Sequence, residues 1–383
     1  MLNIVLSGGP ASGKSTSMAK IEAELSSRLG YKVLICPETA TELIANGIAP
    51  SAAIPGDDFQ ELMLYKQLAK EDLYRDVARR FYDPDKTIIL YDRGILDQLA
   101  YMPRDAFNAM LARHYMDMSA VVSRYDAIIH LVTSAIGTDC YSTANNVARR
   151  ETAEEAAEVD RKTLSANVNH PHVRVIDNST GFEQKIQRVL HVIYDLIGVP
   201  VPSEIERKYL IRRPSDDLLR SLSFSSQNDI IQTYLISEQK GLERRVRQRG
   251  TKEDGYSFYY TEKMPVSDIE RIERERKITM QEYVAHLAEA DNHLHQIKKR
   301  RYCFVYENQY FEMDIYPFSQ TEAILEIELS GKDDTVKLPE FIDVIADVTE
   351  DERYKNHSIA KTLAFPELGS SVCGAHHGEI NQE

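Results

Sequence analysis

The chain has 383 residues, of which 43% are hydrophobic and 28% charged, a composition typical of a globular protein with about two to three domains. Its net charge of −14 argues against a protein that chiefly coats duplex nucleic acid, although a local basic pocket remains compatible with it. Four scattered cysteines without a CxxC pair fit a reducing cytoplasm better than a disulfide scaffold or a zinc site.

Apolar strands alternate with helices through the first half of the chain. The predicted strands are 2–7, 32–38, 86–94, 126–133 and 172–177, and the predicted helices are 14–29, 57–82, 105–124, 147–168 and 182–198. Because continuously apolar strands need cover on both faces, this alternation predicts an α/β domain over residues 1–197 with a parallel sheet between helices.

The pattern changes after "GVPVPS", whose prolines and glycine predict a linker at 198–203. Residues alternate in character beyond it, which predicts an antiparallel domain over 204–362 that curls up on itself. We expect eight strands, one helix at about 280–295, and helix with loop again at 338–361. The strands are 204–212, 229–237, 242–249, 256–264, 269–278, 298–306, 309–316 and 322–330.

Two features of the chain as a whole complete this outline. The polar, glycine-containing residues 363–383 are expected to form a mobile tail. A run of about 18 apolar residues and a basic leader are both missing from the sequence, so we expect a soluble cytoplasmic protein without a membrane partner.

"GGPASGKS" fits the pattern G-x-x-x-x-G-K-[ST] between a strand and a helix. Glycines there allow backbone N–H groups to surround phosphates, and the N-terminus of the helix adds a positive dipole. The pattern predicts a site for ATP with Mg²⁺, in which Lys14 reaches the β- and γ-phosphates and Ser15 ligates the metal. The cradle comprises Gly8, Gly9, Pro10, Ala11, Ser12, Gly13, Lys14, Ser15 and Thr16.

Further candidates for catalysis follow in the same half. Asp92 ends an apolar strand, where it could hold a water on Mg²⁺ or take a proton from an attacking hydroxyl, or simply cap a helix. Arg149 and Arg150 open a charged helix and could close over the transferred phosphate, although a solvated helix face is an equal alternative. Glu38 could face the acceptor or the metal.

Residues 1–197 resemble the small P-loop kinase-like ATPases, relatives of nucleoside and nucleotide kinases. The matching stretches are "GGPASGKS", "PETATELI" at 37–44 and "YDRGILD" at 91–97. This resemblance implies that the domain binds a nucleoside triphosphate, and it leaves the phosphoryl acceptor open.

Charged side chains recur at every second position on the strands of the second half. Side chains two apart on a strand share a face, and unpaired charges cannot face an ordinary core. The face is therefore either the solvated side of a sheet or the inside of a charged tunnel. Its members are Glu204, Glu206, Lys208, Arg245, Arg247, Arg249, Lys263, Arg271, Glu273, Glu275, Lys277, Lys299, Arg301, Glu312, Asp314, Glu326 and Glu328.

The alternate residues of these strands are apolar enough to pack outward, which favours the tunnel. Arginines and lysines bind phosphates, and carboxylates bind divalent cations, so a triphosphate with Mg²⁺ or Mn²⁺ would use both signs. In "RIERERK" and "KKRRY" neighbouring charges leave the register open by one residue, which would reverse the face.

Residues 203–362 resemble the CYTH domain, the triphosphate tunnel metalloenzymes. The first strand carries E-x-E-x-K, then RVR, a later lysine and a final E-x-E follow in order, and "YKNHSIA" at 354–360 resembles the closing segment of that family. The resemblance implies a closed eight-stranded antiparallel tunnel. Metal ligands would be Glu204, Glu206, Glu326 and Glu328, with Glu273 and Asp314 as further acids, and phosphate ligands would be Lys208, Arg245, Arg247, Lys263, Arg271 and Arg301.

The resemblance implies a range of reactions, because family members hydrolyse inorganic or organic triphosphates, some act on RNA 5′ ends, and some cyclise ATP. We therefore predict a bifunctional enzyme, a P-loop kinase or ATPase joined to a triphosphatase. One alternative is a sensor of nucleotide and polyphosphate without turnover, and another is a class IV adenylyl cyclase. The large acidic set favours turnover, and the sequence leaves the substrates, the coupling of the sites and the oligomeric state open.

Overall fold

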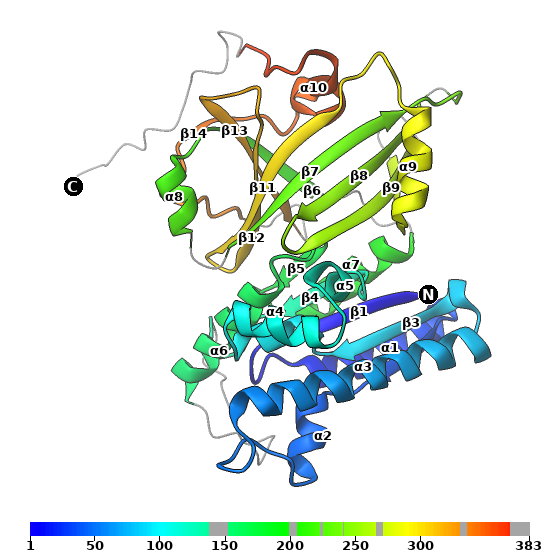
Figure 1. Cartoon of the computed structure of the whole chain (residues 1–383), viewed down its shortest axis with the longest axis vertical. Helices are drawn as coiled ribbons and strands as arrows, with labels where there is room; N and C mark the ends of the chain where they lie inside the picture. The colour runs from blue at the N-terminus through cyan, green and yellow to red at the C-terminus, as the bar shows by residue number, and fades with distance from the viewer. Residues whose placement is uncertain are drawn as a thin grey trace, which may run out of the picture.

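The computed structural model describes residues 1–137, 152–198, 205–222, 225–239, 241–265, 271–329 and 335–367. It contains a five-stranded sheet in the order β2-β3-β1-β4-β5 and a nine-stranded sheet in the order β10-β9-β8-β7-β11-β12-β13-β6-β14. Figure 1 shows the first sheet among its helices and the second sheet rolled above it.

All neighbours in the first sheet are parallel, as the alternation of strands and helices predicts. Its strands are β1 Leu2–Ser7, β2 Lys32–Cys36, β3 Thr87–Asp92, β4 Ala127–Leu131 and β5 Val173–Ile176. Its helices are α1 Lys14–Leu29, α2 Thr39–Ala45, α3 Gly56–Phe81, η1 Pro84–Lys86, η2 Ile95–Ala100, α4 Arg104–Arg113, α5 Met118–Val122, α6 Ala153–Asn167 and α7 Phe182–Ile197.

Two apolar cores cover the two faces of this sheet. On β1, Val5 packs into a core with residues of α3 and α4, whereas Ile4 and Leu6 pack into a core with residues of α1 and α7. All three side chains have no exposed surface. Burial on both faces explains why β1 is apolar at every position from Ile4 to Leu6.

One predicted helix of this domain was wrong in extent. The stretch 105–124 forms two helices, because the chain turns between α4 and α5 and Tyr115 adopts a positive φ of 55° there. Asp117 restarts the helix, since its carboxylate accepts the N–H of Ala120 at 2.7 Å. The apolar spacing on either side of this turn is helical, which is why periodicity alone joined them.

The second sheet is antiparallel throughout its paired strands. Its strands are β6 Ile205–Arg212, β7 Ser225–Leu235, β8 Glu243–Thr251, β9 Gly255–Pro265, β10 Arg271–Ile278, β11 Ile297–Tyr306, β12 Gln309–Ile315, β13 Glu322–Leu329 and β14 Val344–Asp347. The helices of this half are α8 Asp216–Ser221, α9 Met280–His286, η3 Leu287–Glu289, η4 Glu352–Tyr354 and α10 Asn356–Thr362.

The predicted count of eight strands was wrong, because β14 adds a ninth within the stretch 338–361 that was expected to be helix and loop. This short strand pairs with β6, and its register shifts between Val344 and Ala346, so it lacks a regular alternation that sequence analysis could detect. The outermost strands, β10 and β14, are not paired with each other in the described residues, so backbone hydrogen bonds do not close the ring there.

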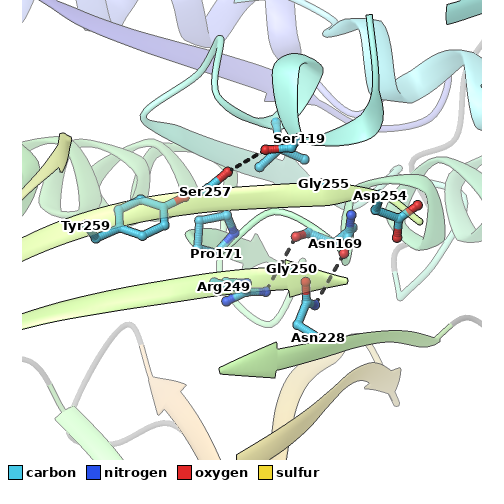
Figure 2. Close-up of a pocket in the computed structure, with 11 residues that line it drawn as sticks. Ser119, Asn169, Pro171, Asn228, Arg249, Gly250, Asp254, Gly255, Ser257 and Tyr259 are labelled. Atoms are coloured by element: carbon cyan, nitrogen blue, oxygen red, sulfur yellow. Dashed lines mark hydrogen bonds between the residues drawn. The ribbon is translucent and has the colours of Figure 1, made fainter. Parts of the chain in front are cut away.

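The two domains are in direct contact through the segment that follows α6 and through α5. The backbone N–H of Ser119 donates to the carbonyl of Asp254 at 2.8 Å, and the hydroxyls of Ser119 and Ser257 lie 3.0 Å apart. The amide of Asn228 donates to the Asn169 side chain at 3.2 Å. Figure 2 shows these groups around a small pocket between the domains.

Among the helices of the described ranges, none is long and apolar enough to cross a lipid bilayer.

His170 lies fully buried beside this contact and is expected to make stability depend on pH. Its Nδ1 accepts the N–H of His172 at 3.1 Å, and its Nε2 lies 3.2 Å from the Tyr125 carbonyl, so the neutral ring uses both nitrogens. Burial, with the positive charge of Lys277 in support, lowers the pKa of His170 well below its usual value. The neutral form is therefore required in the folded state.

The contribution of His170 should be present above pH 6.5 and lost as the pH falls, because the unfolded chain then takes up a proton that the folded chain rejects. The expected slope is about 1.4 kcal/mol of unfolding free energy per pH unit below that point. Urea unfolding of the wild type and His170→Gln between pH 8 and 5.5 measures the difference in unfolding free energy between the two proteins, which should become smaller as the pH falls. A difference that stays constant over this range would contradict the assignment.

Candidate active sites

The loop between β1 and α1 has the shape of a phosphate cradle. Gly8 and Gly13 have φ values of 139° and 88°, and a Cβ at Gly8 would lie 2.2 Å from the carbonyl oxygen of Leu131. A Cβ at Gly13 would lie 2.7 Å from the ring of Phe182. Both positions therefore need glycine, for backbone conformation and for space.

Lys14 is folded back onto the loop that precedes it. Its ammonium donates to the carbonyls of Gly8 at 2.9 Å and Gly9 at 3.3 Å and to the Ser12 hydroxyl at 3.2 Å. Burial, followed by the positive charge of Arg93, lowers the pKa of Lys14 to about 8. These three partners are uncharged, so a bound phosphate would give the ammonium a direct ionic partner. Ser15 and Thr16 are exposed at the start of α1.

Asp92 ends β3 beside the cradle, where it has no capping role. Gly94, not Asp92, is the residue that precedes η2, so the interpretation of Asp92 as a helix cap was wrong. Its Oδ1 is buried without a hydrogen-bond partner, and burial, opposed by Lys14 and aided by Glu38, raises its pKa. An unpaired carboxylate oxygen near Lys14 fits the predicted contact with an Mg²⁺ water or an acceptor hydroxyl.

Glu38 and Asp97 flank Arg93 next to Asp92. The guanidinium of Arg93 lies 2.6 Å from Glu38 and 3.7 Å from Asp97. Burial acts to raise the pKa of Glu38, but the charges of Arg93 and Lys14 outweigh it and hold that pKa below its usual value. Arg93 thus helps to keep Glu38 ionised beside the cradle.

Sequence analysis missed the residues that hold the cradle from outside. Asp160 on α6 accepts the N–H of Gly9 at 2.6 Å and that of Thr133 at 3.1 Å. Lys185 on α7 donates to the carbonyl of Val132 at 2.7 Å and to that of Ser12 at 3.4 Å. Both residues are charged and yet buried. The sequence does not reveal this burial, because α6 is rich in charged residues and α7 has an ordinary amphipathic pattern. Arg149 and Arg150 lie outside the described residues.

In the second domain, the strand pairing settles which charged side chains share a face. On β6 and β13, Lys208 is opposite Glu326, and Glu206 is opposite Glu328. On β11 and β12, Arg301 is opposite Asp314. The register that was open in "KKRRY" therefore places Lys299 and Arg301 on the inner face.

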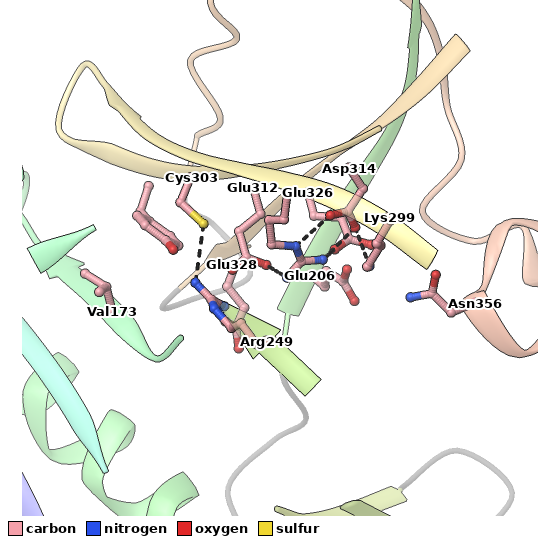
Figure 3. A network of polar contacts seen from close by, with 12 residues as sticks. Val173, Glu206, Arg249, Lys299, Cys303, Glu312, Asp314, Glu326, Glu328 and Asn356 are labelled. Atoms are coloured by element: carbon pink, nitrogen blue, oxygen red, sulfur yellow. Dashed lines mark hydrogen bonds and ion pairs between the residues drawn. The ribbon is translucent and has the colours of Figure 1, made fainter. Parts of the chain in front are cut away.

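Arg301 is the centre of an ion-pair network inside the sheet. Its guanidinium lies 2.6 Å from Asp314 and 2.8 Å from Glu326, and it also pairs with Glu312. Lys208 pairs with Glu326 at 2.9 Å, and Lys299 pairs with Asp314. Figure 3 shows Lys299, Glu312, Asp314 and Glu326 of this network close together. Asp314 is therefore engaged by two cations.

A second group of charges lies on β8, β9 and β10. Arg247 pairs with Glu275 at 2.9 Å, and the Thr261 hydroxyl donates to the same carboxylate at 2.9 Å. Burial acts to raise the pKa of Glu275, but Arg247 and His172 outweigh it and lower that pKa far below its usual value. In the pairing of β9 with β10, Glu275 is opposite Thr261, so the register of "RIERERK" faces Glu275 inward.

Arg249 differs from the other inner cations because it is buried without an ion pair. Only 4% of its surface is exposed. Within the described residues its guanidinium contacts the Asn169 carbonyl at 3.4 Å and the Cys303 sulfur at 3.6 Å, and no carboxylate. Sequence analysis placed Arg249 on this face and assigned it no role.

The described residues contain no cluster of three or more side chains arranged to share a metal ion. Glu206 and Glu326 come closest to a metal site. Removal from bulk water inside the sheet, followed by the charge of Glu326, raises the pKa of Glu206 to about 7, although 46% of its side chain stays exposed. Two carboxylates this close carry an excess of negative charge, which a divalent cation would neutralise.

The other predicted metal ligands fit the metal less directly. Glu328 pairs with Arg174 of the first domain. Glu204 lies outside the described residues, as does the side chain of Glu273.

Among the predicted phosphate ligands, the side chain of Arg271 also lies outside the described residues. Arg245 lies 3.8 Å from Glu243 at the start of β8.

Comparison with known proteins adds to this picture for the first domain. Residues 3–185 match the family model of an AAA domain. The matched range includes the cradle, Asp92 and Asp160, and ends at Lys185. A search of curated proteins finds no match for the chain.

Among solved structures, the chain is similar to the inorganic triphosphatase NE1496, with 25% identity, coverage of 42% of this chain and 97% of that one, and a TM-score of 0.31. A second structure, titled the hypothetical protein NE1496, matches at 25% identity over 43% of this chain and 100% of that chain, with the same TM-score. The PH1012 protein from Pyrococcus horikoshii OT3 matches at 19% identity over 33% of this chain and 80% of that one, with a TM-score of 0.25. These TM-scores are low, so the likeness by itself assigns no function to this chain.

The lowered pKa of Lys14 predicts that nucleotide binding weakens in alkaline solution. Above pH 8 the free protein loses the Lys14 proton, so ATP must bind together with a proton and its affinity should fall by up to about tenfold per pH unit. Titration calorimetry with ATP and Mg²⁺ at pH 7.5, 8.5 and 9.5 measures the change. Lys14→Arg should bind less tightly at pH 7.5 and show little pH dependence, because arginine stays protonated. A flat wild-type profile would contradict the prediction.

Replacing either of two inner-face glutamates by glutamine should change the stability of the protein in different directions. Glu326→Gln removes the carboxylate that pairs with both Lys208 and Arg301 inside the sheet and should lower the free energy of unfolding by about 3 kcal/mol or more. Glu206→Gln removes a carboxylate that is crowded by Glu326, so stability at pH 8 should hold or rise. Denaturant unfolding of both variants at pH 8 compares them, and equal losses would contradict the pairing described here.

Proposed function

We propose that the chain is a bifunctional phosphate-handling enzyme. The first domain would bind ATP with Mg²⁺ and act as a kinase or ATPase, and the second would hydrolyse a triphosphate with Mg²⁺ or Mn²⁺. The observation that carries the second half is Arg249, a buried guanidinium without a carboxylate partner among the described residues. A buried cation without a partner is costly, and an anionic ligand would supply that partner.

The inner face has further cations that would hold such a ligand. Arg245, Arg247 and Arg249 alternate along β8, so they form a row with about 13 Å between the first and last Cα atoms. Guanidinium groups bind phosphate oxygens through several N–H donors at once. A linear triphosphate fits such a row better than a single phosphate does. Lys208, Lys263, Arg271 and Arg301 would bind from neighbouring strands.

Glu206 and Glu326 are the residues that would hold the divalent cation. When bound, the cation would neutralise phosphate charge and polarise the phosphoryl group that is attacked. Lys208 lies between the two carboxylates, 3.5 Å from Glu206 and 2.9 Å from Glu326, so it would orient both and also reach a phosphate oxygen. Arg301 keeps Glu326 ionised in the same way.

In the first domain, Lys14 would bind the β- and γ-phosphates and Asp92 would activate the acceptor. The unpartnered Oδ1 of Asp92 supports that role, because a base needs a free oxygen within reach of the proton it takes. Arg93 would hold Glu38 and Asp97 in place around the site. Screening hydroxyl compounds with labelled ATP would identify the acceptor.

The proposed triphosphatase activity predicts that the protein releases phosphate from tripolyphosphate only when Mg²⁺ or Mn²⁺ is present. Glu206→Gln should lower this rate by at least about 100-fold while the protein stays folded, because a ligand charge is lost at nearly constant volume. The control is Glu262→Gln, which changes a glutamate on the outer face of β9 that accepts the Tyr260 hydroxyl.

Phosphate release over a metal titration, with thermal unfolding alongside, is the measurement. Wild-type turnover in Glu206→Gln at every metal concentration would exclude the tunnel site. Cyclic AMP from ATP would instead support a cyclase, and binding of tripolyphosphate without any product would support a sensor.

A further inference from the structure

The charged interior of the second domain is closed at the end where α10 lies. The Tyr316 hydroxyl donates to Asn356 of α10 at 2.8 Å, and the rings of Tyr234 and His357 are 5.1 Å apart. Lys299 and Asp314 are buried next to this end. Figure 3 shows Asn356 on one side of the ion-pair network and Val173 of the first domain on the other.

On β6 and β13, exposure of the inner charges increases toward the first domain, whereas Arg249 of β8 is buried beside Asn169 of that domain. Asp314 is fully buried and Glu326 is 8% exposed, whereas the side chains of Glu328 and Glu206 are 33% and 46% exposed. The accessible part of the charged interior therefore lies beside β6 and β13, at the end where Glu328 meets the first domain.

The first domain supplies side chains to this entrance. His172 and Arg174 are two residues apart at β5, the edge strand of the parallel sheet. His172 lies 3.0 Å from Glu275 of β10, and Arg174 pairs with Glu328 of β13. These are the first and seventh strands in the order of the rolled sheet. One short segment can contact both only if it lies across the opening of the roll.

Arg174 has donors to spare for a ligand at this entrance. One guanidinium nitrogen donates to Glu328 and another to the Val173 carbonyl at 3.2 Å. A guanidinium has five N–H donors, so in the described part of the chain several of them have no partner. The side chain is 24% exposed, which keeps these donors accessible.

We propose that the triphosphate site is shared between the two domains, and that Arg174 makes it select triphosphates whose outer phosphate is not esterified. This inference rests on the proposed triphosphatase function. A triphosphate that enters end-on leaves its outer phosphate at the entrance, next to Arg174. An unesterified outer phosphate has about one negative charge more than an esterified one at neutral pH. Arg174 therefore binds inorganic tripolyphosphate more tightly than a triphosphate ester.

The reaction is the same for both kinds of substrate. A water oxygen forms a bond to the innermost phosphorus, the bond from that phosphorus to the bridging oxygen breaks, and the leaving diphosphate keeps the electron pair. Protons from water end on the two products. Arg174 is a positioning residue in this scheme, because it contacts the outer phosphate and not the reacting atoms.

The matched probes are inorganic tripolyphosphate and methyl triphosphate, which differ by one methyl ester at the outer end. Steady-state phosphate release with Mg²⁺ gives kcat and KM for each probe with the full-length wild type and Arg174→Ala. The wild type should have a KM about tenfold lower for tripolyphosphate than for the ester. Arg174→Ala should raise the KM for tripolyphosphate by about the same factor, hardly change that for the ester, and leave kcat nearly unchanged.

Two further variants separate positioning from stability. Arg174→Lys should restore part of the preference, because it keeps a positive charge at the entrance. Arg161→Ala, at an exposed arginine of α6 that pairs with Glu158, should match the wild type.

Equal KM values for the two probes in the wild type would overturn the proposal, and so would a loss in Arg174→Ala that is the same for both probes. If neither probe is hydrolysed, the triphosphatase function itself fails. In that case tripolyphosphate and methyl triphosphate binding by calorimetry decides the inference, and equal affinities in the wild type overturn it.

Discussion

The second domain depends on the mutual neutralisation of charges that its sheet encloses. Arg301 is nearly fully buried, and the three carboxylates of Glu312, Asp314 and Glu326 surround it. Removing one partner from such a network leaves a buried charge, which costs far more than the loss of a surface ion pair. The network therefore fixes the order and register of β11, β12, β13 and β6 more strictly than apolar packing would.

The same constraint explains where a ligand would act. Around Asp314, each cation is paired with a carboxylate, so no positive charge is left for a ligand to neutralise. Two arginines near the first domain differ from this arrangement. Arg249 has no carboxylate partner among the described residues, and Arg174 has N–H donors that no described group uses. An anion gains most at such positions, because the protein has already placed the donors there.

Helix α6 connects the two candidate sites. Asp160 on this helix holds the N–H of Gly9 in the cradle, and Asn167 at its end donates to Asp97 at 2.6 Å. The chain then continues directly to Val168, whose carbonyl accepts the Ser226 hydroxyl of β7 at 3.0 Å. The second half of α6, from Asp160 to Asn167, thus connects the phosphate cradle to the contact with the second domain.

Much of the fold could be predicted because the responsible forces act over a few residues. The apolar runs of β1 to β5 and the glycine pattern after β1 are local, and α1 spans the residues 14–29 that were expected. Alternation also placed Lys208, Arg301 and Glu326 on one face. The turn at Tyr115 and the irregular strand β14 were missed, because a positive φ and a register shift leave no periodic signal.

The sequence by itself determined the cradle, the two fold classes and the inner set of charges, since spacing along one strand or loop specifies each of them. Only the tertiary structure decided which charges pair, that Arg249 is buried without a carboxylate, and that Asp160, Lys185 and Arg174 take part in the two sites. Those contacts join residues far apart in the chain, and Arg174 and Glu328 are separated by 154 positions. Their energies depend on burial and distance, which arise only when both domains are folded against each other.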